Sequence, residues 1–213
     1  LRLSRRAHDI NSRVFGDSNL QTAHAANNIG AVYWQLQQNE QALEYYRKSL
    51  EVHERVAGPD HPETATSREN VANALARLQR FDESIPLLEK VLAVRRAKAG
   101  DDAAITVRTM GNLAAHELQA GHLDRSHAWF DAALPRYAKA YGEDHPDYGS
   151  ILPNYAALLR KKTEPARAEA LYRQALAIRL SKLGPEHLST AKTRFDLAEV
   201  LRDRSAYAEA EPL

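Results

Sequence analysis

The chain has 213 residues, of which 44% are hydrophobic and 27% charged, and its formal net charge is +1. Such a balance provides no overall positive field for nucleic acid or for an anionic membrane surface. The chain contains no cysteine, which excludes a disulfide framework and a thiolate metal site. No apolar run approaches the roughly 18 residues of a membrane span. We therefore expect a cytoplasmic protein with neither a nucleic-acid nor a membrane partner.

A period of 42 residues runs through the chain. Five glycines recur at this spacing, and each is followed after twelve residues by an asparagine or, in the last case, an aspartate. A fixed period of this length is typical of proteins built from stacked helical or other structural repeats. The glycines are Gly16, Gly58, Gly100, Gly142 and Gly184, and the polar residues are Asn28, Asn70, Asn112, Asn154 and Asp196.

The period divides the chain into repeats. We interpret residues 17–58, 59–100, 101–142 and 143–184 as full repeats, 1–16 as the end of a preceding unit and 185–213 as a truncated repeat. A free-standing array of stacked repeats needs terminal repeats with a polar outer face, and neither end carries one. We therefore expect a fragment of a longer protein, with self-association through its uncapped ends.

Each repeat is predicted to contain two helices. The first begins at a segment such as 60–63 (Asp-His-Pro-Glu), where a short polar residue caps free N–H groups and proline suits the first turn. The apolar spacing of Val71, Ala72 and Leu75 marks one buried face. A polar turn precedes the second helix, which ends at the next glycine because glycine readily adopts the left-handed conformation of a helix C-cap.

Small and large residues recur at fixed places within the two helices. Small side chains let the helices of a pair approach closely, and a large one fills the space beyond them. The small set comprises Gly30, Ala72, Ala114, Ala156 and Ala198, then Ala42, Ser84, Ser126, Ala168 and Ala210, and the large set Tyr46, Leu88, Phe130 and Tyr172. Glu117 replaces an expected apolar residue, and Pro135 and Pro153 are expected to kink their helices or shift a helix start.

The segment Ile29-Gly30-x-x-Tyr33, followed by Ala42-x-x-x-Tyr46-x-x-Ser49, resembles the tetratricopeptide repeat signature. The 42-residue length, the His-Pro helix start and the first-helix asparagine are most similar to the kinesin light chain variety. The resemblance implies an all-α fold, a right-handed α-solenoid of tandem antiparallel helix pairs. It would comprise five 42-residue units with partial units at both ends, as one solenoid over residues 1–213. In that family the first helices line a concave groove that takes up extended peptides.

The first-helix positions outside the core, which include His24, are the predicted groove surface. An asparagine amide offers donors and an acceptor to a peptide backbone, and basic side chains favour an acidic or carboxylate-bearing ligand. Alternatively, the asparagines hydrogen-bond a neighbouring helix and set the helix spacing, and the basic residues form only a solvated face. The predicted groove residues are Asn28, Asn70, Asn73, Arg77, Arg108, Asn112, Asn154 and Lys161.

No motif for catalysis, a cofactor or a metal ion is apparent. The nine histidines show neither the HExxH pattern nor paired His/carboxylate spacing, and no phosphate-binding glycine loop is present. We predict no enzyme, no cofactor, no catalytic residue and no metal site. The leading hypothesis is a protein–protein interaction scaffold that binds an extended, acidic peptide. The alternatives are a structural spacer or oligomerisation module, and a regulatory domain that packs against another domain of the same multidomain signalling protein.

Overall fold

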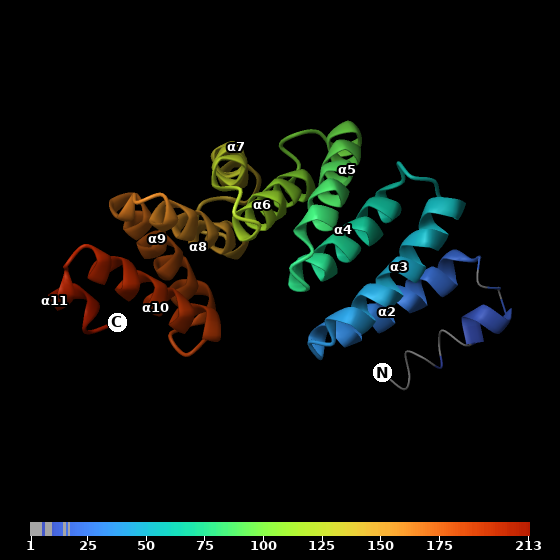
Figure 1. Ribbon diagram of the computed structural model, residues 1–213, viewed down its shortest axis with the longest axis horizontal. Coiled ribbons are helices and arrows are strands. Elements are labelled where there is room, and N and C mark those ends of the chain that lie inside the picture. The colour runs from blue at the N-terminus through green and yellow to red at the C-terminus, as the bar shows by residue number, and fades with distance from the viewer. Residues whose placement is uncertain (1–5, 7–9, 15, 17) are drawn as a thin grey trace. The chain divides into compact units, whose positions relative to one another are not determined.

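A computed structural model describes residues 6, 10–14, 16 and 18–213 (Figure 1). These residues form α-helices joined by short turns, and none of them lies in a β-strand. The chain divides into two compact units, Leu1–Asp101 and Asp102–Leu213. Residues 1–16, predicted as the end of a preceding repeat, lie mostly outside the described residues.

The first unit contains two successive helix pairs. Helix α2 spans Leu20–Gln35 and α3 spans Asn39–Val56, followed by α4 at Pro62–Arg77 and α5 at Phe81–Ala99. Each helix packs on the next one along the chain. The predicted repeats 17–58 and 59–100 therefore each contain one helix pair.

The second unit continues the same alternation. Its helices are α6 (Ala104–Gln119), α7 (Leu123–Tyr141), α8 (Pro146–Lys161), α9 (Pro165–Leu183), α10 (Leu188–Asp203) and the short α11 (Tyr207–Ala210). Successive helices again pack on each other, and α6 also contacts α8, the first helix of the next pair. Tandem packing of adjacent helices thus organises both units.

Close approach within a pair depends on the small first-helix residue. In the first pair, a Cβ atom added to Gly30 would lie 2.7 Å from the ring of Tyr46, which is itself buried. The same two repeat positions hold Ala114 and Phe130 in the second unit, and both side chains are fully buried there. The small-and-large pattern in the sequence therefore corresponds to a close contact within the first helix pair and to two buried positions in the second unit.

Histidines cap three of the first helices. The Nδ1 atoms of His61, His145 and His187 accept hydrogen bonds of 3.1–3.2 Å from the backbone N–H two residues later. The sequence pattern suggested a short polar residue such as Asp60, but the cap is the following histidine, with proline at the first helical position in α4 and α8. An imidazole nitrogen can replace a carboxylate here because only one acceptor is needed.

The prolines do not shift the helix starts. Helix α8 begins at Pro146 and continues through Pro153, and α7 continues through Pro135. Helix α5 likewise contains Pro86. Each proline removes one backbone donor, and the packing of the surrounding helix pair maintains the helical conformation.

In the turn inside each helix pair, the residue at one constant repeat position adopts the left-handed conformation. Gln37, Gln79, Thr163 and Ser205 have φ between 58° and 61° there, and the corresponding Gly121 has φ of 85°. For residues other than glycine this conformation costs roughly 1–2 kcal/mol because Cβ approaches the following carbonyl oxygen. Only the third repeat carries the residue type that avoids the cost.

We predict opposite effects from exchanging residues at this turn. Thr163→Gly should raise the free energy of unfolding by up to about 1 kcal/mol, since relief of the left-handed conformation outweighs the greater freedom of glycine in the unfolded chain. Gly121→Thr should lower it by about 1–2 kcal/mol. Urea denaturation followed by circular dichroism measures both changes. A change of the same sign in the free energy of unfolding of both variants would contradict the cost that we attribute to the left-handed conformation at this position.

Candidate functional site

The first helices of the two pairs in the first unit contact each other along a line that we call the first-helix seam. At one end His24 Nε2 of α2 lies 3.6 Å from Glu63 Oε2 of α4. In the middle Asn70 Nδ2 donates a 2.8 Å hydrogen bond to Asn27 Oδ1. At the other end the Arg77 guanidinium lies 4.3 Å from the centre of the Trp34 ring. Along the seam the residue numbers of the contacting pairs increase on both helices, so α2 and α4 run in the same direction.

Asn70 has a packing role at this seam. Its partner Asn27 lies 43 residues earlier, one residue more than the repeat length, and both side chains are partly buried. Sequence reasoning predicted Asn70 but missed Asn27. The sequence did contain one signal for Asn27, because it directly precedes Asn28, the first of the asparagines that recur every 42 residues. At Asn70 the contact corresponds to the alternative in which the asparagine links neighbouring helices.

Two other predicted residues of the first unit present amides to solvent. Asn28 is exposed and Asn73 partly exposed, and neither side chain has a hydrogen-bond partner among the described residues. Asn73 lies one turn after Asn70, and exposed Arg77 lies one further turn along α4, so the three share a helix face. The first unit therefore carries two available amides and one cation on the two helices that form the seam.

The second unit holds the other four predicted residues. Arg108 and Asn112 lie one turn apart on α6, where Arg108 is exposed and Asn112 partly buried, and each has a polar partner. On α8, Asn154 and Lys161 are both exposed, and neither has a polar partner within the described residues. The position that Asn27 occupies before Asn70 is held before Asn154 by a glycine, Gly111. Asn154 consequently lacks the side chain that would hold it in a seam bond.

Acidic residues at the end of α10 pair with a residue that was not predicted. Arg160 of α8 donates hydrogen bonds to Asp203 and, at 3.2 Å, to Glu199. The bond from Arg160 holds the pKa of Asp203 below its usual range. Arg160 occupies the repeat position of Trp34, and Asp203 that of Arg77, so an ion pair here replaces the stacked contact of the first unit. Nothing in the local sequence distinguished Arg160 from other surface arginines.

A deep polar residue in the second unit belongs to packing. The Tyr155 hydroxyl of α8 donates to Asp131 of α7 and lies 3.0 Å from His127 Nε2. Burial and the bond to Asp131 raise the pKa of Tyr155 to about 12, so the hydroxyl keeps its proton at neutral pH. It therefore serves as a hydrogen-bond donor between helices.

One hollow in the first unit lies away from the first-helix seam. Its volume is about 810 Å³, and a 2.6 Å ion pair between Arg68 and Glu54 lies at its wall. None of the eight predicted residues lines it. Its other lining residues are Pro59, Asp60, Lys90, Ala93, Val94, Ala97 and Lys98. In the part of the chain that the structure describes, no helix combines the length and apolar character needed to cross a membrane.

Several solved structures share this fold. A kinesin light chain-like protein from Podospora anserina with nearly identical TPR-like repeats superimposes with a TM-score of 0.74 at 20% identity, covering 92% of this chain and 91% of that one. BtubC (BKLC) from P. vanneervenii gives 0.80 at 17% identity, with coverage of 99% and 85%. A Rap protein in complex with Competence and Sporulation Factor gives 0.76 at 16% identity, covering 92% of this chain and 54% of that one.

Sequence comparison gives the family directly. No curated protein sequence matches the chain. The tetratricopeptide repeat profile, in contrast, matches five overlapping segments, residues 1–54, 21–97, 66–139, 106–181 and 152–213. These matches cover the chain and overlap at intervals close to the helix-pair period seen in both units. The chain belongs to the tetratricopeptide repeat family.

Proposed function

We propose that the chain is a protein-interaction scaffold that binds an extended, acidic peptide segment along its first helices. Tetratricopeptide repeats generally form non-catalytic interaction scaffolds, which supports the broad role. A related fold in complex with Competence and Sporulation Factor supports ligand binding by such arrays. The observation that carries the finer proposal is the group of available polar side chains beside the seam, namely Asn28, Asn73 and Arg77.

The chemistry of these groups suits an extended backbone. An asparagine amide donates to a peptide carbonyl and accepts from a peptide N–H, so two amides at neighbouring repeats hold a strand independently of its side chains. The Trp34 ring contacts the Arg77 guanidinium at 4.3 Å. A guanidinium stacked on a ring keeps its in-plane N–H donors free for a carboxylate. The acidic preference rests on Arg77 here, and on Lys161 in the second unit.

The test uses two immobilised sets of twelve-residue peptides, one acidic and one with the same residues charge-reversed to lysine. Wild type should select the acidic set. The Asn28→Ala/Asn73→Ala variant should bind the selected peptides about tenfold or more weakly, since each hydrogen bond contributes about 0.5–1.5 kcal/mol. Arg77→Glu should weaken binding further and reduce the acidic preference, which Lys161 also supports. Fluorescence anisotropy of labelled peptides gives the dissociation constants.

Matched controls lie on the second helices. Gln41→Ala on α3 removes an exposed amide, and Lys98→Glu on α5 makes the same charge change as Arg77→Glu on an exposed residue. Both should bind like wild type. Asn70→Ala is unsuitable as a binding test because it breaks the seam bond to Asn27. Unchanged affinity in the Asn28→Ala/Asn73→Ala variant, or no peptide bound by wild type, would reject the proposal. A dimer that persists in sedimentation with these variants would then favour an oligomerisation role.

A further inference from the structure

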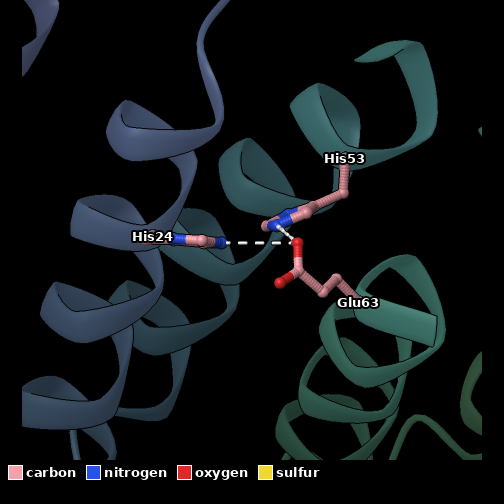
Figure 2. Close-up of side chains that lie close together, drawn as sticks. All are labelled: His24, His53 and Glu63. Carbon is pink, nitrogen blue, oxygen red and sulfur yellow. Dashed lines mark ion pairs between the residues drawn. The ribbon is translucent and has the colours of Figure 1, made fainter. Parts of the chain in front are cut away.

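Three side chains that can each supply one metal-ligand atom converge in the first unit. Figure 2 shows His24 from α2, His53 from α3 and Glu63 from α4 pointing toward one another. Their ligand atoms all lie within 4.8 Å of one another. His24 Nε2 is 3.6 Å and His53 Nε2 is 3.8 Å from Glu63 Oε2, and the two imidazole rings stack with centroids 5.3 Å apart. Each group comes from a different helix, so no local sequence motif indicates the cluster.

These separations approach those of a metal centre more closely than those of a hydrogen-bond network. Zinc binds histidine nitrogen and carboxylate oxygen at about 2.0–2.2 Å, so neighbouring ligand atoms in a tetrahedron lie about 3.3–3.5 Å apart. Direct hydrogen bonds between these atoms would require about 2.7–3.2 Å. The two distances to Glu63 Oε2, 3.6 and 3.8 Å, thus need only a small contraction to hold an ion, and the two imidazole ligand atoms, which lie within 4.8 Å of each other, must also move closer.

The three residues differ in solvent exposure in a way that suits an entry site. The side chain of His53 is 3% exposed, whereas those of His24 and Glu63 are 45% and 50% exposed. The buried imidazole therefore forms a fixed ligand at the base of the cluster. The two exposed side chains are able to rotate inward around an ion that arrives from solvent, and water has access to a fourth position.

The buried imidazole is oriented by contacts on its other nitrogen. His53 Nδ1 lies 2.9 Å from the carbonyl oxygen of Ser49 and 3.1 Å from Ser67 Oγ. A carbonyl oxygen only accepts, so Nδ1 carries the proton in this bond. The lone pair then lies on Nε2, the atom that faces Glu63. Metal-binding histidines characteristically have their second nitrogen fixed in this way by a carbonyl or carboxylate.

The repeat architecture does not itself require this trio. At the same three repeat positions the following repeats carry other residues, and none of them combines two histidines with a carboxylate. In the last of these sets Arg179 takes the place of His53 and donates a 2.8 Å hydrogen bond to the Ser189 carbonyl. The corresponding sets are Thr66, Arg95 and Ile105, then Arg108, Tyr137 and Asp147, then Ser150, Arg179 and Ser189.

We propose that His24, His53 and Glu63 bind one divalent transition-metal ion of the zinc class, with a fourth position open to water. Two imidazoles and one carboxylate are ligands that zinc and its neighbours prefer, whereas magnesium and calcium take oxygen ligands. The spacing of histidines along the chain gave no sign of a metal site, because the three ligands lie on three different helices. The cluster forms across three helices, and it is independent of whether a peptide binds beside the seam.

The first test is titration of untagged, chelator-treated protein with Zn²⁺ in a calorimeter. One equivalent should bind, and Co²⁺ should produce the visible absorption bands of a four-coordinate ion. Saturating Zn²⁺ should raise the melting temperature by several degrees, since an ion that binds only the folded protein stabilises it. Mg²⁺ at equal concentration should produce neither change. Absence of stoichiometric Zn²⁺ binding would overturn the proposal.

Variants locate the ion. His24→Ala and Glu63→Gln each remove an exposed ligand with little effect on the core, and each should weaken Zn²⁺ binding by at least about tenfold. Lys192→Ala and Asp147→Asn change the same two repeat positions elsewhere in the chain and should bind Zn²⁺ like wild type. Circular dichroism checks that all four variants are folded. Equal losses in the controls, or wild-type affinity in His24→Ala and Glu63→Gln, would place the ion at other histidines and reject this site.

Discussion

Replacing Phe130 with alanine is expected to lower the free energy of unfolding of the second unit by about 3–5 kcal/mol. The side chain lies on α7, is fully buried, and its ring stacks on that of Tyr155 with centroids 5.1 Å apart. Truncation therefore leaves a cavity beside the Tyr155 ring. Such a loss combines the transfer energy of the missing ring with the cost of incomplete collapse.

Urea denaturation measured by circular dichroism, with Phe130→Leu as a control, tests this expectation. Leucine is compatible with the position because the second repeat carries Leu88 there, also fully buried. Phe130→Leu should therefore cost clearly less than Phe130→Ala. A loss of under about 1 kcal/mol for alanine would show that the helices close over the cavity, contrary to the packing described here.

The buried carboxylate of Glu117 is expected to give two changes of opposite sign. Its side chain is 0% exposed, with His122 Nδ1 2.7 Å from Oε2 and Arg125 Nη2 2.7 Å from Oε1. Glu117 Oε1 has no hydrogen bond of good geometry, so the Arg125 contact is an ion pair whose N–H does not point at the oxygen. The charge is therefore compensated but imperfectly satisfied.

Removing the partners should destabilise the protein, and removing the charge should not. His122→Ala/Arg125→Ala should cost about 3–5 kcal/mol because a buried carboxylate is left without its polar partners. Glu117→Leu should be neutral or stabilising by about 1–4 kcal/mol, since the lost desolvation penalty outweighs the ion pairs. The corresponding residues in the other repeats are buried and large, namely Tyr33, Leu75, Leu159 and Leu201.

A double-mutant cycle isolates the coupling. Adding His122→Ala/Arg125→Ala to Glu117→Leu should cost little, because the carboxylate that they compensate is gone. Urea denaturation of the four proteins supplies the cycle. If Glu117→Leu destabilised the protein by more than about 1 kcal/mol, the ion pairs would be net stabilising and the desolvation argument would be wrong here.

The helix pairs were predictable because the forces that define them are local. Gly100 ends α5 with φ of +87°, as expected for a residue chosen for the left-handed conformation, and the period of 42 places every helix boundary relative to such glycines. The apolar spacing of Val71, Ala72 and Leu75 marked a face of α4 that is buried. Caps, glycine conformations and helical periodicity depend on residues a few positions apart, so the sequence contains them directly.

Side-chain identities within these local signals were less accessible. The sequence indicated that α4 begins near Pro62 but not that His61 Nδ1 supplies the cap. It marked Glu117 as unusual without revealing its partners, because His122 and Arg125 reach it only after α6 and α7 have packed. Contacts across a helix pair depend on the distance and rotation of both helices, which side-chain packing sets.

By itself, the sequence determined the repeat family, the helix pairs and the recurring small and large positions within them. Only the tertiary structure decided that Asn70 binds Asn27 while Asn28 and Asn73 stay available, and that His24, His53 and Glu63 meet. The physical reason is that a repeat period defines equivalent positions but not which nonequivalent side chains face each other. These contacts depend on how neighbouring helices lie side by side, which involves residues far apart in the chain.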